Sequence, residues 1–206
     1  TLIAWNQRTD GQKEWHRHYN YPDYGASFMF QDFQNPVLGK AYGFYGHFNF
    51  YFLKRRMMLR VGQGVVISSN PYDKNSNPKN IAFGSRLLAS PYLMLNYRKS
   101  NLIGPLGIQS GLLLFHASNG NIKAPNTSVN TIAFNIGLNY DLGSKEIIPE
   151  YLPEKVFISE GLKINLVFRS GLNQISVVGG SQFPFYTFAV DADKRVKFGI
   201  ACQVGW

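Results

Sequence analysis

Apolar and polar side chains alternate along most of the chain. Residues 42–52 show this clearly: Tyr42, Phe44, Phe48, Phe50 and Phe52 share one parity, and Tyr45, His47, Asn49 and Tyr51 share the other. Successive side chains of a β-strand point to opposite faces, so the alternation predicts a strand with one apolar and one more polar face. The pattern recurs to the end of the chain and predicts an all-β protein.

The alternating segments are separated by turn-rich connections. We expect strands at residues 1–8, 23–33, 42–52, 57–69, 81–98, 101–118, 130–140, 156–172, 181–190 and 195–206. An up-and-down order would place the loops at 34–41, 70–80, 119–128 and 171–181 at one end of the sheet, and the turns at 53–56, 97–101 and 191–195 at the other. Two long connections, a polar segment at 9–22 and another at 142–155, fall on the short-turn side.

The apolar stripes are long, and the opposite faces carry small or basic residues. This is typical of membrane strands with apolar residues outside and polar residues inside, and the chain has no apolar run of about 18 residues that could be a membrane-spanning helix. We therefore predict a single domain over residues 1–206, an antiparallel up-and-down transmembrane β-barrel of about ten or more strands in the outer membrane. A soluble, lipocalin-like barrel is the alternative.

These face assignments make specific predictions. The outward, lipid-facing set is Leu112, Leu114, Ile132, Phe134, Ile136, Ile164, Leu166 and Phe168. The inward basic set is Arg60, Arg86, Arg98, Lys163, Arg169 and Lys197. Short turns of such barrels are usually periplasmic, so the long loops are expected at the extracellular rim.

Net charge limits the kinds of binding partner to expect, and the cysteine and histidine positions bear on disulfides and metals. The formal net charge of +9 favours an acidic partner, such as anionic lipid or the phosphates of lipopolysaccharide. The basic residues form no nucleic-acid-binding motif, so no nucleic-acid partner is expected. The single cysteine, Cys202, cannot form an internal disulfide. His16, His18 and His47 lack metal-ligand spacing with any acidic cluster, and we expect neither a metal nor another cofactor.

One predicted hairpin, residues 112–140, also carries candidate chemistry. His116 and Ser118 have the same parity as Leu112 and Leu114, so an imidazole and a hydroxyl share one face of a strand. The polar connection at 119–128 leads into the next strand, which returns Asn130 toward His116.

The segment HASNGNIKAPN, residues 116–126, resembles the His-x-Ser-Asn signature of the lipid A 3-O-deacylases. KEWHRHYNYPDYG and NPYDKNSNPKNIAFGS resemble segments of longer relatives from Bacteroidetes-type bacteria, so the likeness extends over residues 1–141. The resemblance implies an outer-membrane β-barrel esterase whose active site faces lipid on the outer wall. It implies a core of about eight strands, to which residues 142–206 add further strands.

The resemblance also implies roles for individual residues. Ser118 would be the nucleophile, His116 its general base, and Asn119 part of the oxyanion site. The family has a Glu on the following strand, where this chain has Asn130. Lysines in or beside the extracellular loops would meet the phosphates of lipid A, namely Lys40, Lys74, Lys79 and Lys123.

Two functions therefore stay open at the level of sequence. The first is an outer-membrane serine esterase that removes an ester-linked acyl chain from the lipid A of lipopolysaccharide. The second is a catalytically inactive barrel that serves as a structural or accessory subunit of an outer-membrane protein complex. Asn130 is the residue that divides them, because an amide supplies no negative charge to an imidazolium.

Overall fold

The computed structural model describes residues 1–143, 161–174, 177–196 and 200–205, without the side chains of residues 195–206. The first part contains β1 (Leu2–Arg8), α1 (Glu14–His18), β2 (Asp23–Asp32), β3 (Lys40–Phe52), β4 (Met57–Ser68), β5 (Leu87–Ile103), β6 (Leu106–Ala117) and β7 (Val129–Tyr140). The second part contains β8 (Lys163–Gln174), β9 (Gln182–Val196) and β10 (Ile200–Gly205). In the described residues, no helix is long and apolar enough to span a membrane.

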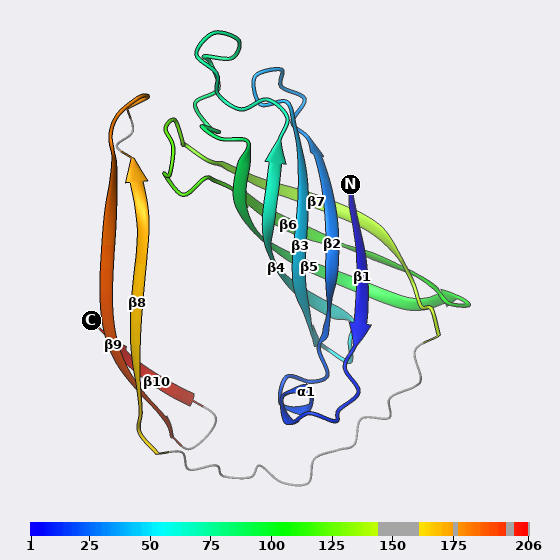
Figure 1. Cartoon of the computed structure of the whole chain (residues 1–206). Helices are drawn as coiled ribbons and strands as arrows, with labels where there is room; N and C mark the ends of the chain where they lie inside the picture. Colours follow the sequence, from blue (N-terminus) through cyan, green and yellow to red (C-terminus); the bar gives the residue numbers. More distant parts are fainter. Residues whose placement is uncertain (144–160, 175–176, 197–199, 206) are drawn as a thin grey trace.

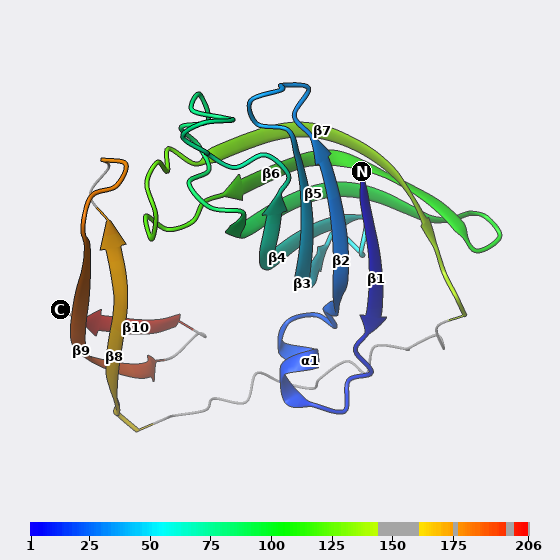
Figure 2. The same cartoon turned by 45° about the horizontal axis from the view of Figure 1, so that its top comes forward.

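The strands form two antiparallel sheets. β1 to β7 pair in chain order in one seven-stranded sheet, and β8 to β10 form a three-stranded sheet with β9 in the middle. Within the described ranges, no ladder joins the two sheets. Figures 1 and 2 show that the larger sheet curls into a half-barrel, with the smaller sheet beside its loops. The all-β, antiparallel, up-and-down fold that the sequence predicts is confirmed.

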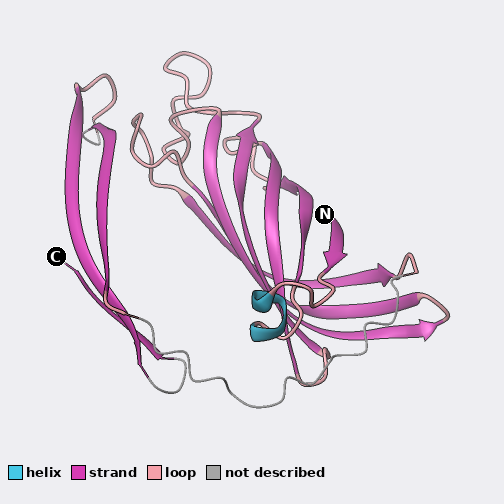
Figure 3. Ribbon diagram, turned by 60° about the horizontal axis from the view of Figure 1, so that its bottom comes forward, coloured by secondary structure: helices cyan, strands magenta, loops and turns pink. Residues whose placement is uncertain are grey.

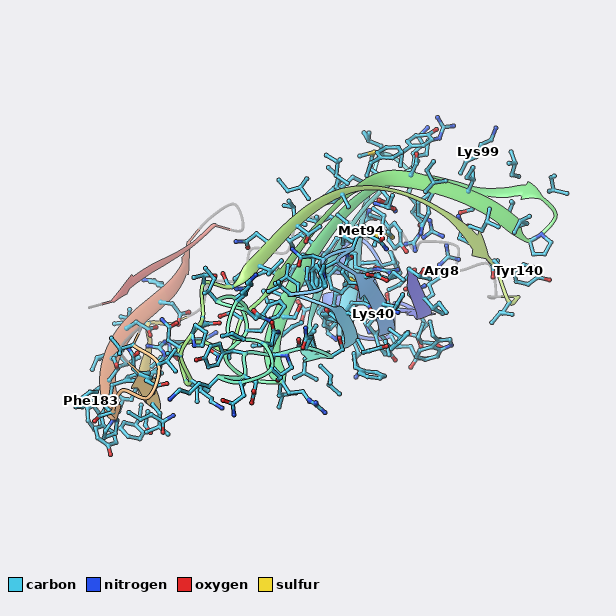
Figure 4. All side chains as sticks on the ribbon, turned by 90° about the horizontal axis from the view of Figure 1, so that it is seen from above. Arg8, Lys40, Met94, Lys99, Tyr140 and Phe183 are labelled. Carbon is cyan, nitrogen blue, oxygen red and sulfur yellow. The ribbon has the colours of Figure 1, made fainter. Side chains whose placement is uncertain are left out.

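The concave face of the larger sheet holds the core. Tyr51, Met58, Tyr92 and Phe115 are buried there, and Figure 4 shows Met94 on the same side. The Tyr92 ring packs against Gly62, where an added Cβ would overlap the ring carbon Cε1, so the glycine makes room for the tyrosine.

Polar groups complete this interior. Arg60 donates from Nε to Asn49 Oδ1 over 2.6 Å and from Nη2 to Asn6 Oδ1 over 3.0 Å. The His47 ring lies 2.9 Å from the same Asn6 oxygen. A buried guanidinium needs such partners because it cannot lose its charge. The lumen side of the sheet is therefore filled by a hydrogen-bonded network.

The inward basic set is only partly correct. Arg60 is buried, and Arg98 is half-buried and donates to the Tyr51 hydroxyl over 2.7 Å. Arg86 is an exception, because it is exposed in the loop that precedes β5. Lys163 and Arg169 are exposed on β8, and Lys197 lies outside the described residues.

The convex face carries the apolar stripes. The predicted outward residues of β6 and β7 are between 46% and 75% exposed. Those of β8, in the smaller sheet, are between 57% and 78% exposed, on a strand whose other side is exposed as well. Aromatic pairs such as Phe28–Phe44, with ring centroids 5.1 Å apart, cover the same face of β2 and β3. The soluble-barrel alternative requires these side chains to form an enclosed core, and they do not.

The long loops gather at one end of the sheet. Asn77 donates from the β4–β5 loop to Val37 O in the β2–β3 loop, and Thr127 of the β6–β7 loop donates its N–H to Ile81 O. At the opposite end, Arg55 of the β3–β4 turn donates to Tyr21 O, next to α1. Figure 3 shows α1 away from the long loops. The polar segment predicted at residues 9–22 therefore contains a helical turn that packs on the short-turn end.

Several predicted strand limits are wrong. Residues 81–86 belong to the β4–β5 loop, and β5 starts only at Leu87. The predicted turn at 97–101 is part of β5, and the chain reverses at Gly104–Pro105, where Gly104 has a φ of 56°. The polar composition of 97–101 suggested a turn, but these residues continue the β5–β6 ladder through Arg98 and Lys99.

The same reason explains the error at 191–195, which belongs to β9 rather than to a turn. Asn165 of β8 donates to the carboxylates of Asp191 and Asp193 over 2.9 and 2.8 Å, so these polar residues pair across strands. Of the strand predicted at 195–206, residues 195–196 belong to β9 and residues 200–205 form β10, while 197–199 and 206 lie outside the described residues. Residues 161–162 precede β8, and residues 144–160 lie outside the described part of the chain.

Candidate functional site

His116 and Asn130 face each other across β6 and β7. They are register partners, and both belong to the convex face that carries Leu114 and Ile132. His116 Nδ1 lies 2.7 Å from Asn130 Oδ1. An amide oxygen only accepts, so Nδ1 is the donor in this contact, and Nε2 of the neutral ring is then the acceptor. The hairpin thus holds the imidazole in the tautomer that a general base requires.

Ser118 follows β6 and continues its register. It exchanges two backbone hydrogen bonds with Ala89, with N–O distances of 2.7 and 3.0 Å. Because strand side chains alternate, Ser118 lies on the His116 side of the sheet. Its Oγ accepts hydrogen bonds from Asn126 Nδ2 over 2.8 Å and from Gly120 N over 3.0 Å.

The Ser118 hydroxyl therefore accepts two hydrogen bonds, one on each lone pair, and its own proton remains available to be donated. In the described residues, no hydrogen bond joins Ser118 Oγ to the His116 ring. Catalytic hydrogen bonds are often longer in unliganded enzymes and shorten when substrate binds. In this structure, the His116 imidazole contacts Asn130, and the Ser118 hydroxyl contacts two donors of the β6–β7 loop.

Asn126 is the residue that sequence reasoning missed. It bonds Ser118 Oγ, donates to Asn121 Oδ1 over 2.9 Å, and accepts from the Asn119 N–H over 3.1 Å. The loop was interpreted only as a polar connection. The available signal was its repeated asparagine, since amide side chains both donate and accept and can organise a short loop around a hydroxyl.

Asn119 lies deeper than the other site residues. Its side chain is buried, and its Nδ2 donates to Lys123 O over 2.6 Å. Its Oδ1 is buried, without a hydrogen-bond partner in the described part of the chain. Through these contacts, Asn119 stabilises the loop. Its contribution to an oxyanion site stays a prediction.

The smaller sheet braces this loop from outside. Ala124 N–H donates to Gln174 Oε1 over 2.6 Å, and Gln174 N–H donates to Asn121 O over 2.8 Å. Gln182 Nε2 donates to Ile122 O over 2.6 Å. Figure 2 shows the facing ends of β8 and β9 beside the β6–β7 loop. Residues far along the chain therefore fix the segment that supplies the donors to Ser118.

The four predicted lysines are all exposed, in or beside the long loops. Lys74 and Lys123 line one shallow pocket together with Asp73, while Lys40 lies 3.9 Å from the Asp32 carboxylate. Hydrogen bonds from the Ser76 and Asn75 N–H groups and the Ser76 hydroxyl, with a smaller contribution from Lys123, lower the pKa of Asp73.

No cluster of three or more His, Cys, Asp or Glu side chains suited to a metal occurs in the described ranges.

The comparison with protein families decides the assignment. A family model described as Lipid A 3-O-deacylase (PagL) matches residues 1–139. The chain belongs to this family. The PagL match ends within β7 and contains His116, Ser118 and Asn130, whereas β8 to β10 lie beyond it. No curated protein and no solved structure matches the chain. The PagL assignment agrees with the resemblance seen in the His-x-Ser-Asn segment.

Proposed function

We propose that this chain is an outer-membrane serine esterase that removes an ester-linked acyl chain from lipid A. The observation that carries the proposal is the position of the His116–Asn130 pair, beside Ser118 and on the exposed apolar face rather than in the lumen. A lipid substrate in the outer leaflet could reach this face directly. The family assignment supports lipid A as the substrate class.

In the proposed reaction, the Ser118 oxygen attacks the ester carbonyl while His116 Nε2 accepts the hydroxyl proton. The bond between the carbonyl carbon and the sugar oxygen breaks, and His116 returns the proton to that oxygen, which leaves as a sugar hydroxyl. Water then hydrolyses the acyl-enzyme by the same proton transfers, releasing a fatty acid. This chemistry requires water and no cofactor.

The negative charge that develops on the carbonyl oxygen needs donors close to the nucleophile. Gly120 N and Asn126 Nδ2 now rest on Ser118 Oγ, at 3.0 and 2.8 Å. We assign them to the oxyanion when substrate is bound. Asn119 would act with them by holding the Lys123 end of the loop.

The membrane placement follows from the two faces of the sheet. β6 and β7 have 12 residues each, and apart from Ser110, His116 and Asn130 their convex sides are apolar. A strand of about 9–11 residues is enough to cross a bilayer. The chain would form one barrel domain, with the long loops outside the cell and with Lys40, Lys74, Lys79 and Lys123 facing the lipid A phosphates.

Asn130 favours a second function, a non-catalytic barrel in an outer-membrane protein complex. In serine proteases, replacing the triad acid by its amide lowers the rate by about 10⁴-fold. Asn130 orients His116 but does not stabilise its protonated form. If the chain is an esterase, it is therefore expected to be a slow one. If it is an accessory subunit, it needs no catalytic activity.

The deciding experiment is mass spectrometry of lipid A incubated with the refolded full chain. The esterase proposal expects loss of one acyl chain from lipid A, and no loss with Ser118→Ala. Ser110→Ala is a matched control, because Ser110 lies on the same strand and has the same parity. Unchanged lipid A after long incubation with the folded native chain would leave the accessory subunit as the better proposal.

A further inference from the structure

A cavity of about 530 Å³ lies at the end of the sheet opposite Ser118. It is lined by the last residue of β1, the β3–β4 turn and the 97–100 segment of β5. Figure 4 labels two of its residues, Arg8 on β1 and Lys99 on β5. Tyr97 pairs with Ser110 in the β5–β6 ladder, while Ser118 bridges to Ala89 at the other end of β5. The cavity is thus separate from the proposed esterase site.

The lining is almost entirely cationic. It consists of Arg8, Lys54, Arg55, Arg56, Tyr97, Arg98, Lys99 and Ser100, with no acidic residue among them. Among the described residues, the one salt bridge that involves this group joins Arg55 Nη2 to the Asp23 carboxylate over 2.8 Å. One carboxylate cannot balance so many cations, and like charges around one cavity repel each other unless an anion binds between them.

Two of the guanidinium groups are held in place. Arg55 donates to Tyr21 O over 2.8 Å, and its Cζ lies 3.7 Å from the centre of the Tyr51 ring. Arg98 donates from Nη1 to the Tyr51 hydroxyl, while its Nε is buried with no hydrogen-bond partner in the described residues. A fixed guanidinium with a spare donor is suited to phosphate, which it binds with little further loss of conformational freedom.

The cavity is continuous with the apolar outer face. Tyr97 lines it and is 49% exposed, in the same stripe of β5 as Leu93 and Leu95. A lipid whose headgroup entered the cavity could lay its acyl chains along this stripe. Free phosphate would use the cations but not the stripe.

We propose that this cavity is a binding site for a phosphate-bearing anion, with the headgroup of an anionic phospholipid as the occupant that the neighbouring apolar stripe favours. The site does not depend on the esterase reaction. In a barrel with its long loops outside the cell, it faces the periplasmic leaflet. There it would anchor the short-turn end of the protein to phospholipid while the opposite end meets lipopolysaccharide.

The test is binding to the refolded full chain in a neutral detergent, measured by calorimetry. Short-chain phosphatidylglycerol, short-chain phosphatidylcholine and inorganic phosphate are the three probes. We expect phosphatidylglycerol to bind more tightly than either of the others, and Arg98→Gln to weaken it about tenfold, the usual effect of losing one charge-assisted hydrogen bond. Phosphate binding as tightly as phosphatidylglycerol would support the anion site and assign it to free phosphate.

Two further variants separate the site from general charge and from misfolding. Lys54→Gln removes a lining cation from the exposed turn without touching Tyr51, and it should also weaken phosphatidylglycerol. Arg86→Gln removes the same charge at the other end of the sheet, at an exposed loop residue, and should leave the affinity unchanged. Equal losses in Lys54→Gln and Arg86→Gln, or no binding of any phosphate probe, would overturn the proposal.

Discussion

His116 Nδ1 and Asn130 Oδ1 lie 2.7 Å apart on directly opposed residues of β6 and β7. This contact orients the histidine and favours the tautomer protonated on Nδ1. These are two of the three roles of the acid in a catalytic triad. The third, stabilisation of the imidazolium by negative charge, is missing from an amide. In the proposed enzyme, the base is therefore oriented but lacks the negative charge that would stabilise its protonated form.

Restoring the acid should raise activity. We expect Asn130→Glu to increase the deacylation rate by less than the about 10⁴-fold that the amide costs serine proteases, because there the amide also imposes the wrong tautomer, whereas in this chain the carboxylate would add only negative charge beside an imidazole that is already oriented. Asn130 is exposed, so the longer side chain has room. The rate is measured by mass spectrometry of lipid A over time. Thr127→Glu places the same charge in the preceding loop, which does not contact the ring, and should leave the rate unchanged.

Asn126 should act on the chemical step rather than on substrate binding. Asn126→Asp removes the donor to Ser118 Oγ while keeping an oxygen for the Asn119 N–H. We expect kcat to fall by about 10²- to 10³-fold, the usual cost of one oxyanion donor, with little change in KM. A change confined to KM would mean that Asn126 binds ground-state substrate and is not an oxyanion donor.

The smaller sheet should control the geometry of the β6–β7 loop. Gln174→Ala removes the acceptor for the Ala124 N–H, so we expect faster hydrogen exchange at Ala124 and a lower kcat. Gln63→Ala is the control, since within the described residues the one hydrogen bond of the Gln63 side chain is the 3.5 Å contact with its neighbour Gly64. Ser118→Ala should abolish activity without changing exchange at Ala124. Unchanged exchange in Gln174→Ala would contradict the bracing role.

The convex face should behave as a lipid-facing surface. Phe134 is 68% exposed in the middle of β7, and Phe134→Lys should lower the free energy of unfolding in lipid vesicles by about 2–4 kcal/mol. Ile122 is 53% exposed but lies in a loop, so Ile122→Lys should cost much less. Unfolding is followed by tryptophan fluorescence in urea. Equal costs for the two variants would argue against membrane insertion through this face.

Alternation in the sequence was enough to establish the strands, their up-and-down order and the shared face of His116, Ser118 and Asn130. These properties are local, because a two-residue period assigns each side chain to a face and a hairpin returns the chain beside itself. Where β5 and β9 end could not be predicted from the local sequence. Polar residues such as Arg98 and Asp193 resemble turn residues until a partner strand pairs with them.

Only the tertiary structure decided what surrounds the nucleophile. Asn126 reaches Ser118 because the loop folds back on itself, and Gln174 reaches that loop from a strand beyond the family match. The basic cavity likewise joins β1, the β3–β4 turn and β5. Contacts between distant segments depend on how the sheet curls and where its loops meet, and no periodicity along a single chain encodes those distances. The sequence therefore determined the face on which the candidate residues lie, and the packing of loops against strands determined which groups surround them.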